Sequence, residues 1–432
     1  MTHTFFVRGK HFIFDSESGA LHKGDALIAE IVAEITPPMS EICPPEMIEL
    51  YGNDGTEIWA ELYALQQDGQ LFTPETLAVM ENPGVIKAIC LHVAHDCNLR
   101  CEYCFAGTGD FGQSRGLMDV ETGRQAVDFL LAHAGNRRHL EIDFFGGEPL
   151  MAWETVVATV AYAKRQAAAH DKVIRLTLTT NGLLLDDMKI DYINTEIDNV
   201  VLSLDGRVGV HDALRKTVSG ENSHALVLEK FQKLVAQREK SYYVRGTFTV
   251  KNLDFSQDVL ALREMGFRHV SIEPVVLSAT HELAILPRHI PEIEAEYEKL
   301  LDILVKRPDI NFFHFNVNLD SGPCAYKRAK GCGAGVEYVA ITPEGDIFPC
   351  HQFVGQSEYK LGSLHHGIQG NKHDFASHNL YTRALCATCW ARYLCGGGCP
   401  AANLTENGNI ETPYEIGCRL ACKRFECALS RL

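Results

Sequence analysis

The sequence His95-Asp96-Cys97-Asn98-Leu99-Arg100-Cys101-Glu102-Tyr103-Cys104-Phe105 organises the rest of the chain, because it places three cysteines at C-x3-C-x2-C spacing. Such a loop can bind three irons of a [4Fe–4S] cluster and leave the fourth iron free, whereas these clusters normally take four cysteines. A site one ligand short is suited to holding a further molecule. Zinc sites usually show two C-x2-C pairs, or one such pair with two histidines, and this loop shows neither pattern.

The composition predicts a globular cytoplasmic protein of two or three domains. The chain has 432 residues, of which 46% are hydrophobic and 22% charged, and these are ordinary values for globular proteins. We find no run of eighteen apolar residues, which a membrane span would need, and the N-terminus lacks the features of a signal peptide. In a reducing cytoplasm the fifteen cysteines are better metal ligands than disulfide partners.

Negative charge is concentrated at the N-terminus. The net charge of −16 argues against nucleic acid as a partner. Residues 1–85 contain three Lys or Arg and fourteen Asp or Glu, a net charge of −11. This distribution indicates either a basic partner for residues 1–85 or simply a well-solvated surface.

Residues 1–85 are predicted to form a small winged-helix-like domain. Alternating apolar residues predict short strands at 5–7 and 11–15, and helical spacing predicts helices at 25–35, 46–51 and 56–67. A sheet of this kind has an exposed edge to which an extended peptide can add as a further strand. The pattern alone leaves a peptide-binding domain and a structural cap as alternatives.

Residues 86–290 alternate between strand and helix patterns, which predicts a parallel sheet. About six β/α units indicate a partial (β/α)6 barrel, whose active site is expected at the C-terminal ends of the strands. The conspicuous polar motifs follow predicted strands: the cysteine loop, Gly146-Gly147-Glu148-Pro149, Thr180-Asn181-Gly182, Leu204-Asp205-Gly206 and Glu273-Pro274.

The cysteine loop after the first barrel strand and Gly-Gly-Glu-Pro after the second resemble the radical S-adenosylmethionine (radical SAM) enzymes. The aromatic Tyr103 before the third cysteine also fits. In that family the open iron chelates the amino and carboxylate groups of SAM. Reductive cleavage of SAM then gives methionine and a 5′-deoxyadenosyl radical, which removes a hydrogen atom from the substrate. The resemblance makes Cys97, Cys101 and Cys104 the cluster ligands and catalytic centre.

The resemblance also implies contacts to SAM. Gly146 and Gly147 would let the backbone approach the methionine moiety, with carbonyl groups or Glu148 accepting from its ammonium. Ser203 and Asp205 would bind the ribose, and Tyr103 would contact the adenine. Arg215 and Arg245 are candidates for pairing with the carboxylate of SAM, because guanidinium binds carboxylate bidentately. Surface salt bridges or contacts to substrate are the alternatives for both arginines. The expected cofactor-binding residues are Tyr103, Gly146, Gly147, Glu148, Pro149, Ser203, Asp205, Arg215 and Arg245.

After a helix predicted at 291–307, in a segment (291–325) that bridges out of the barrel, residues 326–432 form a cysteine-rich domain. A hairpin is predicted at 340–348, and counting from Cys324 the C-terminal region contains enough sulfur for two four-iron clusters. The cysteine order resembles the SPASM domain of radical SAM peptide and protein maturases. That resemblance implies a first auxiliary cluster on Cys332, Cys350 and Cys399, with Cys324 as the natural fourth ligand unless the position is open. A second would be held by Cys386, Cys389, Cys395 and Cys418. Cys422 and Cys427 are interpreted as ordinary helical cysteines, and Cys43 and Cys90 as core residues.

Further motifs narrow the resemblance to the SCIFF peptide maturases, which install thioether crosslinks in cysteine-rich ribosomal peptides. They are residues 92–100, 105–112, 136–149, 322–328 and 331–335. The resemblance spans the whole chain and implies that residues 1–85 bind a precursor peptide, through a leader that we expect to be basic. It implies SAM, three [4Fe–4S] clusters and an electron donor of the flavodoxin or ferredoxin type, without a membrane partner.

Two alternatives to thioether formation remain at this stage. One is another SPASM modification, either carbon–carbon crosslinking or formylglycine formation. The other is a non-catalytic iron–sulfur or zinc scaffold that only binds a peptide, which would leave Gly-Gly-Glu-Pro and the ribose-type strand end without a role.

Overall fold

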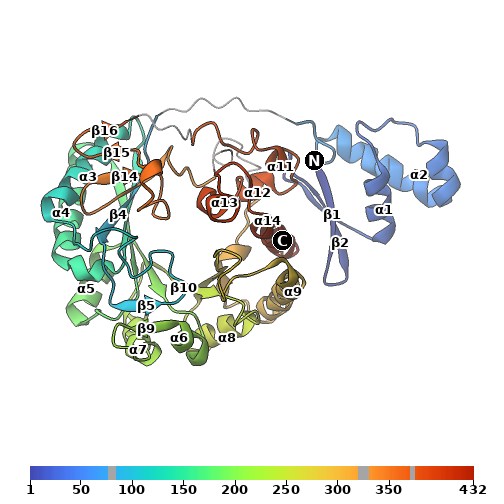
Figure 1. The fold of residues 1–432 in the computed structure, drawn as a ribbon. Coiled ribbons are helices and arrows are strands. Elements are labelled where there is room, and N and C mark those ends of the chain that lie inside the picture. Colours follow the sequence, from blue (N-terminus) through green and yellow to red (C-terminus); the bar gives the residue numbers. More distant parts are fainter. Residues whose placement is uncertain (76–83, 320–328, 330, 370–374) are drawn as a thin grey trace.

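The computed structural model describes residues 1–75, 84–319, 329, 331–369 and 375–432. An open barrel of strands and helices occupies most of the molecule (Figure 1). The cysteine-rich C-terminal part lies across the open side of the barrel, and the N-terminal module, here defined as residues 1–75, lies outside against that part (Figure 1).

The barrel consists of parallel strands, which confirms the predicted α/β radical SAM fold. Neighbouring strands follow the order β11-β10-β8-β7-β6-β4 and every pair is parallel. The strands are β4 (Ala88–Ala94), β6 (His139–Gly146), β7 (Val173–Thr180), β8 (Asn199–Ser203), β10 (Ser241–Phe248) and β11 (His269–Pro274). Their C-terminal ends therefore meet at one rim of the barrel.

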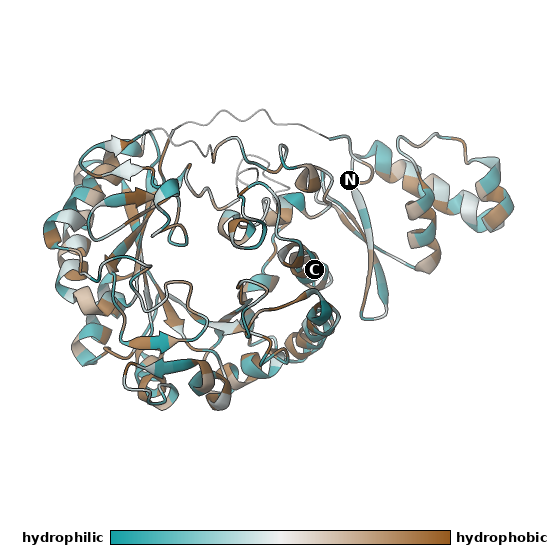
Figure 2. Ribbon diagram, in the orientation of Figure 1, coloured by the Kyte–Doolittle hydropathy of each residue, from teal (hydrophilic) through white to brown (hydrophobic). Residues whose placement is uncertain are grey.

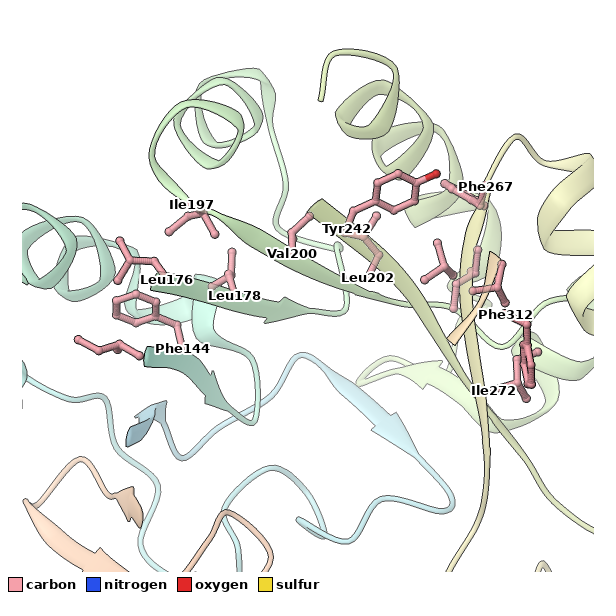
Figure 3. Close-up of a cluster of buried hydrophobic side chains, with 14 of the residues drawn as sticks. Phe144, Leu176, Leu178, Ile197, Val200, Leu202, Tyr242, Phe267, Ile272 and Phe312 are labelled. Atoms are coloured by element: carbon pink, nitrogen blue, oxygen red, sulfur yellow. The ribbon is translucent and has the colours of Figure 1, made fainter. Parts of the chain in front are cut away.

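Helices cover the outside of this sheet. They are α3 (Val120–His133), α4 (Trp153–Ala169), α5 (Asp187–Glu196), α6 (Val208–Leu214), α7 (His224–Ala236) and α8 (Ser256–Glu264). Asp119 and Asp186 cap α3 and α5 by accepting from backbone N–H groups of the first turn. The apolar faces of the helices pack on the strands, with Phe144, Leu178 and Leu202 fully buried between the layers (Figure 3). Brown and teal residues alternate along the ribbons of these helices in Figure 2, as expected for helices with one buried and one solvated face.

The N-terminal module has one strand more than the sequence predicts. Its antiparallel sheet comprises β1 (Thr2–Val7), β2 (Lys10–Asp15) and β3 (Leu21–Gly24), followed by α1 (Ala26–Glu34) and α2 (Pro45–Gln67). Strand β3 could not be predicted from alternating apolar residues, because only Leu21 among its four residues is a large apolar one. The two helices predicted at 46–51 and 56–67 are halves of α2, which is interrupted at Gly52 with φ 61° and ψ −139°.

The segment after β11 returns to the sheet instead of only bridging out of it. Helix α9 (Ile290–Lys306) is followed by β12 (Asn311–Phe312), which pairs with β11 in parallel. The C-terminal part adds β13 (Tyr338–Ile341) to the opposite edge, parallel to β4, and the predicted hairpin continues with β14 (Asp346–Phe348). The same eleven-stranded sheet therefore runs from the barrel into the cysteine-rich part.

The remaining elements are short, apart from the last helix. They are β5 (Leu99–Cys101), β9 (Arg215–Thr217), β15 (Gly362–Ser363), β16 (Gly367–Ile368), α11 (Ala384–Ala387), α12 (Arg392–Cys395), α13 (Pro400–Asn407), α14 (Glu415–Leu429) and the 3-10 turns Pro149–Ala152, Pro287–His289, Phe313–Phe315 and Ser357–Tyr359. Within the described ranges, none of the helices is long and apolar enough to cross a membrane.

Candidate active site

The three cysteines of the loop after β4 lie together on the wall of a cavity of about 530 Å³. Their thiols are close enough to influence one another's ionisation, and burial, the largest cause, raises the pKa of Cys97 to about 12 and that of Cys101 to about 11. Three thiolates could share this space only beside a compensating cation, because burial disfavours each charge. The loop therefore fits an iron–sulfur cluster, whose binding would release the thiol protons.

Backbone contacts shape this loop. The Arg100 guanidinium donates to the carbonyl oxygens of Cys97 at 2.6 Å and Leu99 at 2.7 Å. The Asp96 carboxylate accepts from the Cys97 N–H at 2.8 Å and from Arg115 at 2.7 Å. These contacts fix the path of the chain through the first cysteine before any cluster is bound.

Gly146 and Gly147 make room for the cysteine loop itself. A Cβ atom on Gly146, whose φ is +134°, would lie 2.3 Å from the Ala94 carbonyl oxygen, and one on Gly147 would lie 2.2 Å from that of Asp96. Both glycines line the cavity. From the sequence we expected these glycines to let the backbone approach SAM. The structure shows that the backbone of the cysteine loop already leaves no room for a side chain at either position.

Glu148 connects the ends of two neighbouring strands. Its carboxylate is buried and accepts from the Leu150 N–H at 3.1 Å, the Thr180 hydroxyl at 2.7 Å and the Asn181 N–H at 2.8 Å. Burial outweighs these bonds and raises the pKa of Glu148 to about 7. An ammonium group placed in the cavity beside it would favour the ionised form.

Asp205 is not among the residues that line the cavity, and its role at the ribose stays a prediction. The side chain is 0% exposed. Its oxygens accept from the Tyr103 hydroxyl at 2.6 Å, from Arg215 Nε at 2.9 Å and from the Thr247 N–H at 3.0 Å. Asp205 therefore positions its neighbours, while Ser203 on β8 does face the cavity.

The guanidinium of Arg215, predicted as a candidate partner for the SAM carboxylate, contacts other groups in this structure. It lies 5.4 Å from the centre of the Tyr103 ring and pairs with Asp205, and its Nη1 is 3.9 Å from Cys101 Sγ. Strand β9, which begins at Arg215, pairs with β5, which ends at Cys101. Arg215 thus fastens the cysteine loop to the barrel, although part of it still lines the cavity.

Arg245, in the second half of β10, lines the cavity in a group of charged side chains. It donates to Glu273 at 2.7 Å, and Glu273 lies 3.8 Å from His314, which contacts Arg424 at 3.3 Å. Burial opposes ionisation of Glu273, but the nearby cations outweigh it and hold its pKa below the usual value. Arg245 is half-exposed and could exchange Glu273 for a bound carboxylate.

The C-terminal cysteines form two groups among the described residues. Besides burial, which is the largest cause, Cys399 and Cys332 both raise the pKa of Cys350, and these three cysteines form the first group. The second consists of Cys386, Cys389, Cys395 and Cys418, joined by Cys422. Cys324 lies outside the described residues.

One cavity reaches all three cysteine groups. Its wall includes the cysteine loop, Cys399 of the first C-terminal group, and Cys395 and Cys418 of the second. Among the described residues no three His, Cys, Asp or Glu side chains are placed to hold a single metal ion. A four-iron cluster makes a different demand, because each cysteine binds its own iron.

Cys422 and Cys427, both on α14, have different neighbours. Cys422 donates its S–H to Cys389 and, as the largest cause, lowers the pKa of Cys389 to about 6. Cys422 lies near Cys389, Cys395 and Cys418, which affect its ionisation, and its interpretation as an ordinary helical cysteine stays a prediction. Cys427 is buried and its pKa responds to burial, to Lys423 and to acidic neighbours, not to another cysteine.

Sequence reasoning missed several residues of the cavity wall. The Asn181 side chain donates to Asn98 at 2.8 Å and lies 3.7 Å from Cys97 Sγ, and the Thr-Asn-Gly motif at a strand end could have identified it. His351 and Arg424 also line the cavity. Only the fold brings Arg424 there, since it lies on the last helix, far from the barrel in sequence.

The N-terminal module packs directly against the second C-terminal group. The His3 ring stacks on Trp390 with centroids 4.0 Å apart and an interplanar angle of 7°. Glu17 forms a buried ion pair with Arg392 and accepts from the Tyr393 hydroxyl at 3.2 Å. We call these contacts the clasp. Its C-terminal members lie between Cys389 and Cys395, so the clasp connects the module to that loop.

Known proteins are similar to this chain at two levels, the barrel alone and most of the chain. Residues 91–244 match the family model of the radical SAM superfamily. The chain is 25% identical over 368 residues to the cysteine-type anaerobic sulfatase-maturating enzyme of Clostridium perfringens, covering 78% of this chain and 94% of the relative. It is 24% identical over 368 residues to the radical SAM cyclopropyl synthase TigE of Paramaledivibacter caminithermalis, covering 77% and 71%.

Solved structures support the fold at lower identity. Native anSMEcpe with bound AdoMet superimposes with a TM-score of 0.66 at 18% identity, over 80% of this chain and 97% of that one. Streptococcus suis SuiB bound to precursor peptide SuiA gives 0.56 at 15% identity, over 96% of this chain and 98% of that one. The barrel of this chain is thus a radical SAM domain, in a chain similar to SPASM-type maturases.

Proposed function

We propose that this chain is a radical SAM peptide maturase that joins cysteine sulfur to carbon in a cysteine-rich ribosomal peptide of the SCIFF type. The observation that carries the proposal is the cavity shared by the Cys97 loop and both C-terminal cysteine groups. A substrate in this cavity is within reach of all three. A peptide oxidation that removes hydrogen at carbon and also disposes of an electron needs such an arrangement.

The cysteines are proposed to hold one SAM-binding and two auxiliary [4Fe–4S] clusters. Cys97, Cys101 and Cys104 hold the first, Cys332, Cys350 and Cys399 with Cys324 the second, and Cys386, Cys389, Cys395 and Cys418 the third. When bound, SAM and its cluster would supply the hydrogen-abstracting 5′-deoxyadenosyl radical, and the auxiliary clusters an acceptor for the remaining electron.

The residues of this chain bind and orient the reactants. Gly146, Gly147 and Glu148 form the wall for the methionine end of SAM, and Ser203 faces the ribose. Asp205 and Arg215 hold Tyr103 and the cysteine loop in place. Arg245 remains the candidate for a bound carboxylate, at the cost of its pair with Glu273.

The N-terminal module is proposed to bind the precursor leader by strand addition. Its small antiparallel sheet has β1 and β3 as outer strands, and its acidic composition favours a basic leader segment. The SuiB structure that covers 96% of this chain is described as bound to its precursor peptide. The reductant is proposed to be of the flavodoxin or ferredoxin type.

Formylglycine formation is the second candidate, because a cysteine-type sulfatase-maturating enzyme aligns with 78% of this chain. Mass spectrometry separates the two. A precursor encoded beside this gene and co-expressed anaerobically should lose two hydrogens for each thioether and retain its sulfur, whereas formylglycine formation removes sulfur. Cys97→Ala should abolish both the mass change and SAM cleavage. An unmodified precursor with the intact enzyme would contradict the proposal.

A further inference from the structure

A buried arginine without an acidic partner lies in the cysteine-rich part. Arg383 is 6% exposed, and no carboxylate of the described residues pairs with its guanidinium. Its Nη1 donates to the Gly397 carbonyl oxygen at 2.6 Å, and its Nη2 donates to that of Ile410 at 3.0 Å. Its Nε is buried without a hydrogen-bond partner among the described residues. Neutral carbonyl groups compensate a buried charge only in part, so this position favours an anion nearby.

The guanidinium is bound midway between cysteines of the two C-terminal groups. Gly397, whose carbonyl oxygen accepts from Nη1, is two residues from Cys395 of the second group and two from Cys399 of the first. The backbone of Arg383 also supports the second group, because its carbonyl oxygen accepts from the Cys386 N–H at 2.9 Å. One positive charge is therefore fixed to the segment that joins the two groups.

The rest of the first group packs on the same glycine segment. A Cβ atom on Gly331, the residue before Cys332, would lie 2.8 Å from the Gly396 carbonyl oxygen. Burial lowers the pKa of Arg383, whereas two thiols of each group favour its charge and oppose this effect. The backbone contacts and the thiols thus agree that the charge of Arg383 acts on both groups.

We propose that Arg383 supplies a positive charge that both auxiliary clusters share and that raises the reduction potential of each. The inference rests on the proposed function, which assigns clusters to these cysteine groups. A four-iron cluster with thiolate ligands has a net negative charge that sets its potential, and reduction adds one electron to it. A fixed cation nearby therefore stabilises the reduced form more than the oxidised form. Bond formation between a carbon radical and a thiolate releases one electron, which a cluster of higher potential accepts more readily.

Arg419 provides a matched comparison, because it also lies beside a proposed ligand. It follows Cys418 directly, but its side chain is 50% exposed and pairs with Glu294 at 3.2 Å. Solvent and a paired carboxylate screen a charge of this kind. Removal of the Arg419 charge should therefore leave the potentials of both auxiliary clusters nearly unchanged.

A redox titration of the reconstituted full chain, followed by EPR, tests the inference. In Arg383→Gln the equilibrium constant for one-electron reduction of each auxiliary cluster should fall by about tenfold or more, which is a shift of about 59 mV. Arg383→Lys, which retains the charge without the planar donor fork, should stay within about threefold of wild type, and so should Arg419→Gln. The SAM-binding cluster should not shift, and Cys97→Ala, which lacks it, identifies the auxiliary signals.

Iron content decides the test if Arg383→Gln fails to load its auxiliary clusters. Arg383→Lys should then still contain about twelve irons, whereas a role limited to hydrogen bonding of the two carbonyls predicts equal loss in both variants. Unchanged potentials in Arg383→Gln, a shift of one auxiliary cluster alone, or equal loss of iron from both variants would overturn the inference. A wild type with fewer than about twelve irons would instead contradict the proposed auxiliary clusters.

Discussion

At the scale of single residues, the structure separates groups that face the cavity from groups that hold them. Asp205 and Ser203 lie two positions apart and were predicted to share a role at the ribose. The sequence identified the strand end correctly, but it could not show which of the two side chains points inward. That depends on the packing of Tyr103 and Arg215 around the carboxylate, contacts between residues far apart in the chain.

Asp205→Asn tests the positioning role. The substitution leaves the Arg215 guanidinium, which is 11% exposed, without a charged partner, and we expect a loss of about 2–3 kcal/mol in the free energy of unfolding. SAM affinity should fall at least tenfold through displacement of Tyr103. Denaturant unfolding and equilibrium dialysis measure the two effects.

The control for this variant is Asp254→Asn, which removes the same charge from a half-exposed partner of Arg207. We expect little change in SAM affinity for the control. A residue that only contacted the ribose would reduce affinity without altering the stability of SAM-free protein. Unchanged stability of Asp205→Asn without SAM would therefore contradict a positioning role.

At the scale of elements, the strands and helices of the barrel could be predicted because their apolar periodicity is local. The location of the site at the C-terminal rim of the barrel could also be predicted, because polar motifs follow the strands. The pairing of β13 with β4 could not be predicted, since it joins residues about 250 positions apart through backbone groups that any sequence offers. This pairing brings His351, just after β14, to the cavity that the cysteine loop lines.

The clasp between the N-terminal module and the second cysteine group leads to a prediction for Glu17. Glu17→Gln removes the more deeply buried of the two carboxylates that pair with the buried Arg392, the other being Glu75, so we expect a loss of about 1–3 kcal/mol in stability. The same change should weaken the attachment of the loop from Cys389 to Cys395 to the N-terminal module. Thermal unfolding and iron content of the reconstituted enzyme measure both.

Glu57→Gln is the matched control, because it removes the same charge from an exposed position on α2 of the same module. The control should unfold as wild type does. Equal melting temperatures for both variants would show that the clasp does not contribute to stability. Point variants are preferable to deleting residues 1–85, because the deletion would also expose Trp390 and remove the partner of Arg392.

At the scale of the whole molecule, three segments of very different sequence character meet around one reaction space. The barrel contributes the cysteine loop and the proposed wall for SAM, the C-terminal part contributes two further cysteine groups, and the module docks beside one of them. Spacing predicted the three-cysteine loop, and the resemblance to SPASM domains implied how the C-terminal cysteines divide into two sets. The sequence could not show that they share a cavity, because distances between sets depend on the closure of the sheet and on α14.

The central claim is tested most directly by following hydrogen from peptide to cofactor. An anaerobic reaction of the reconstituted enzyme with SAM and a precursor deuterated at its candidate acceptor carbons would be analysed by mass spectrometry. We predict deuterium in 5′-deoxyadenosine, one 5′-deoxyadenosine for each thioether formed, and no product from the Cys97→Ala enzyme. Thioether formation without deuterium transfer, or deuterium transfer without a sulfur–carbon bond, would contradict the account.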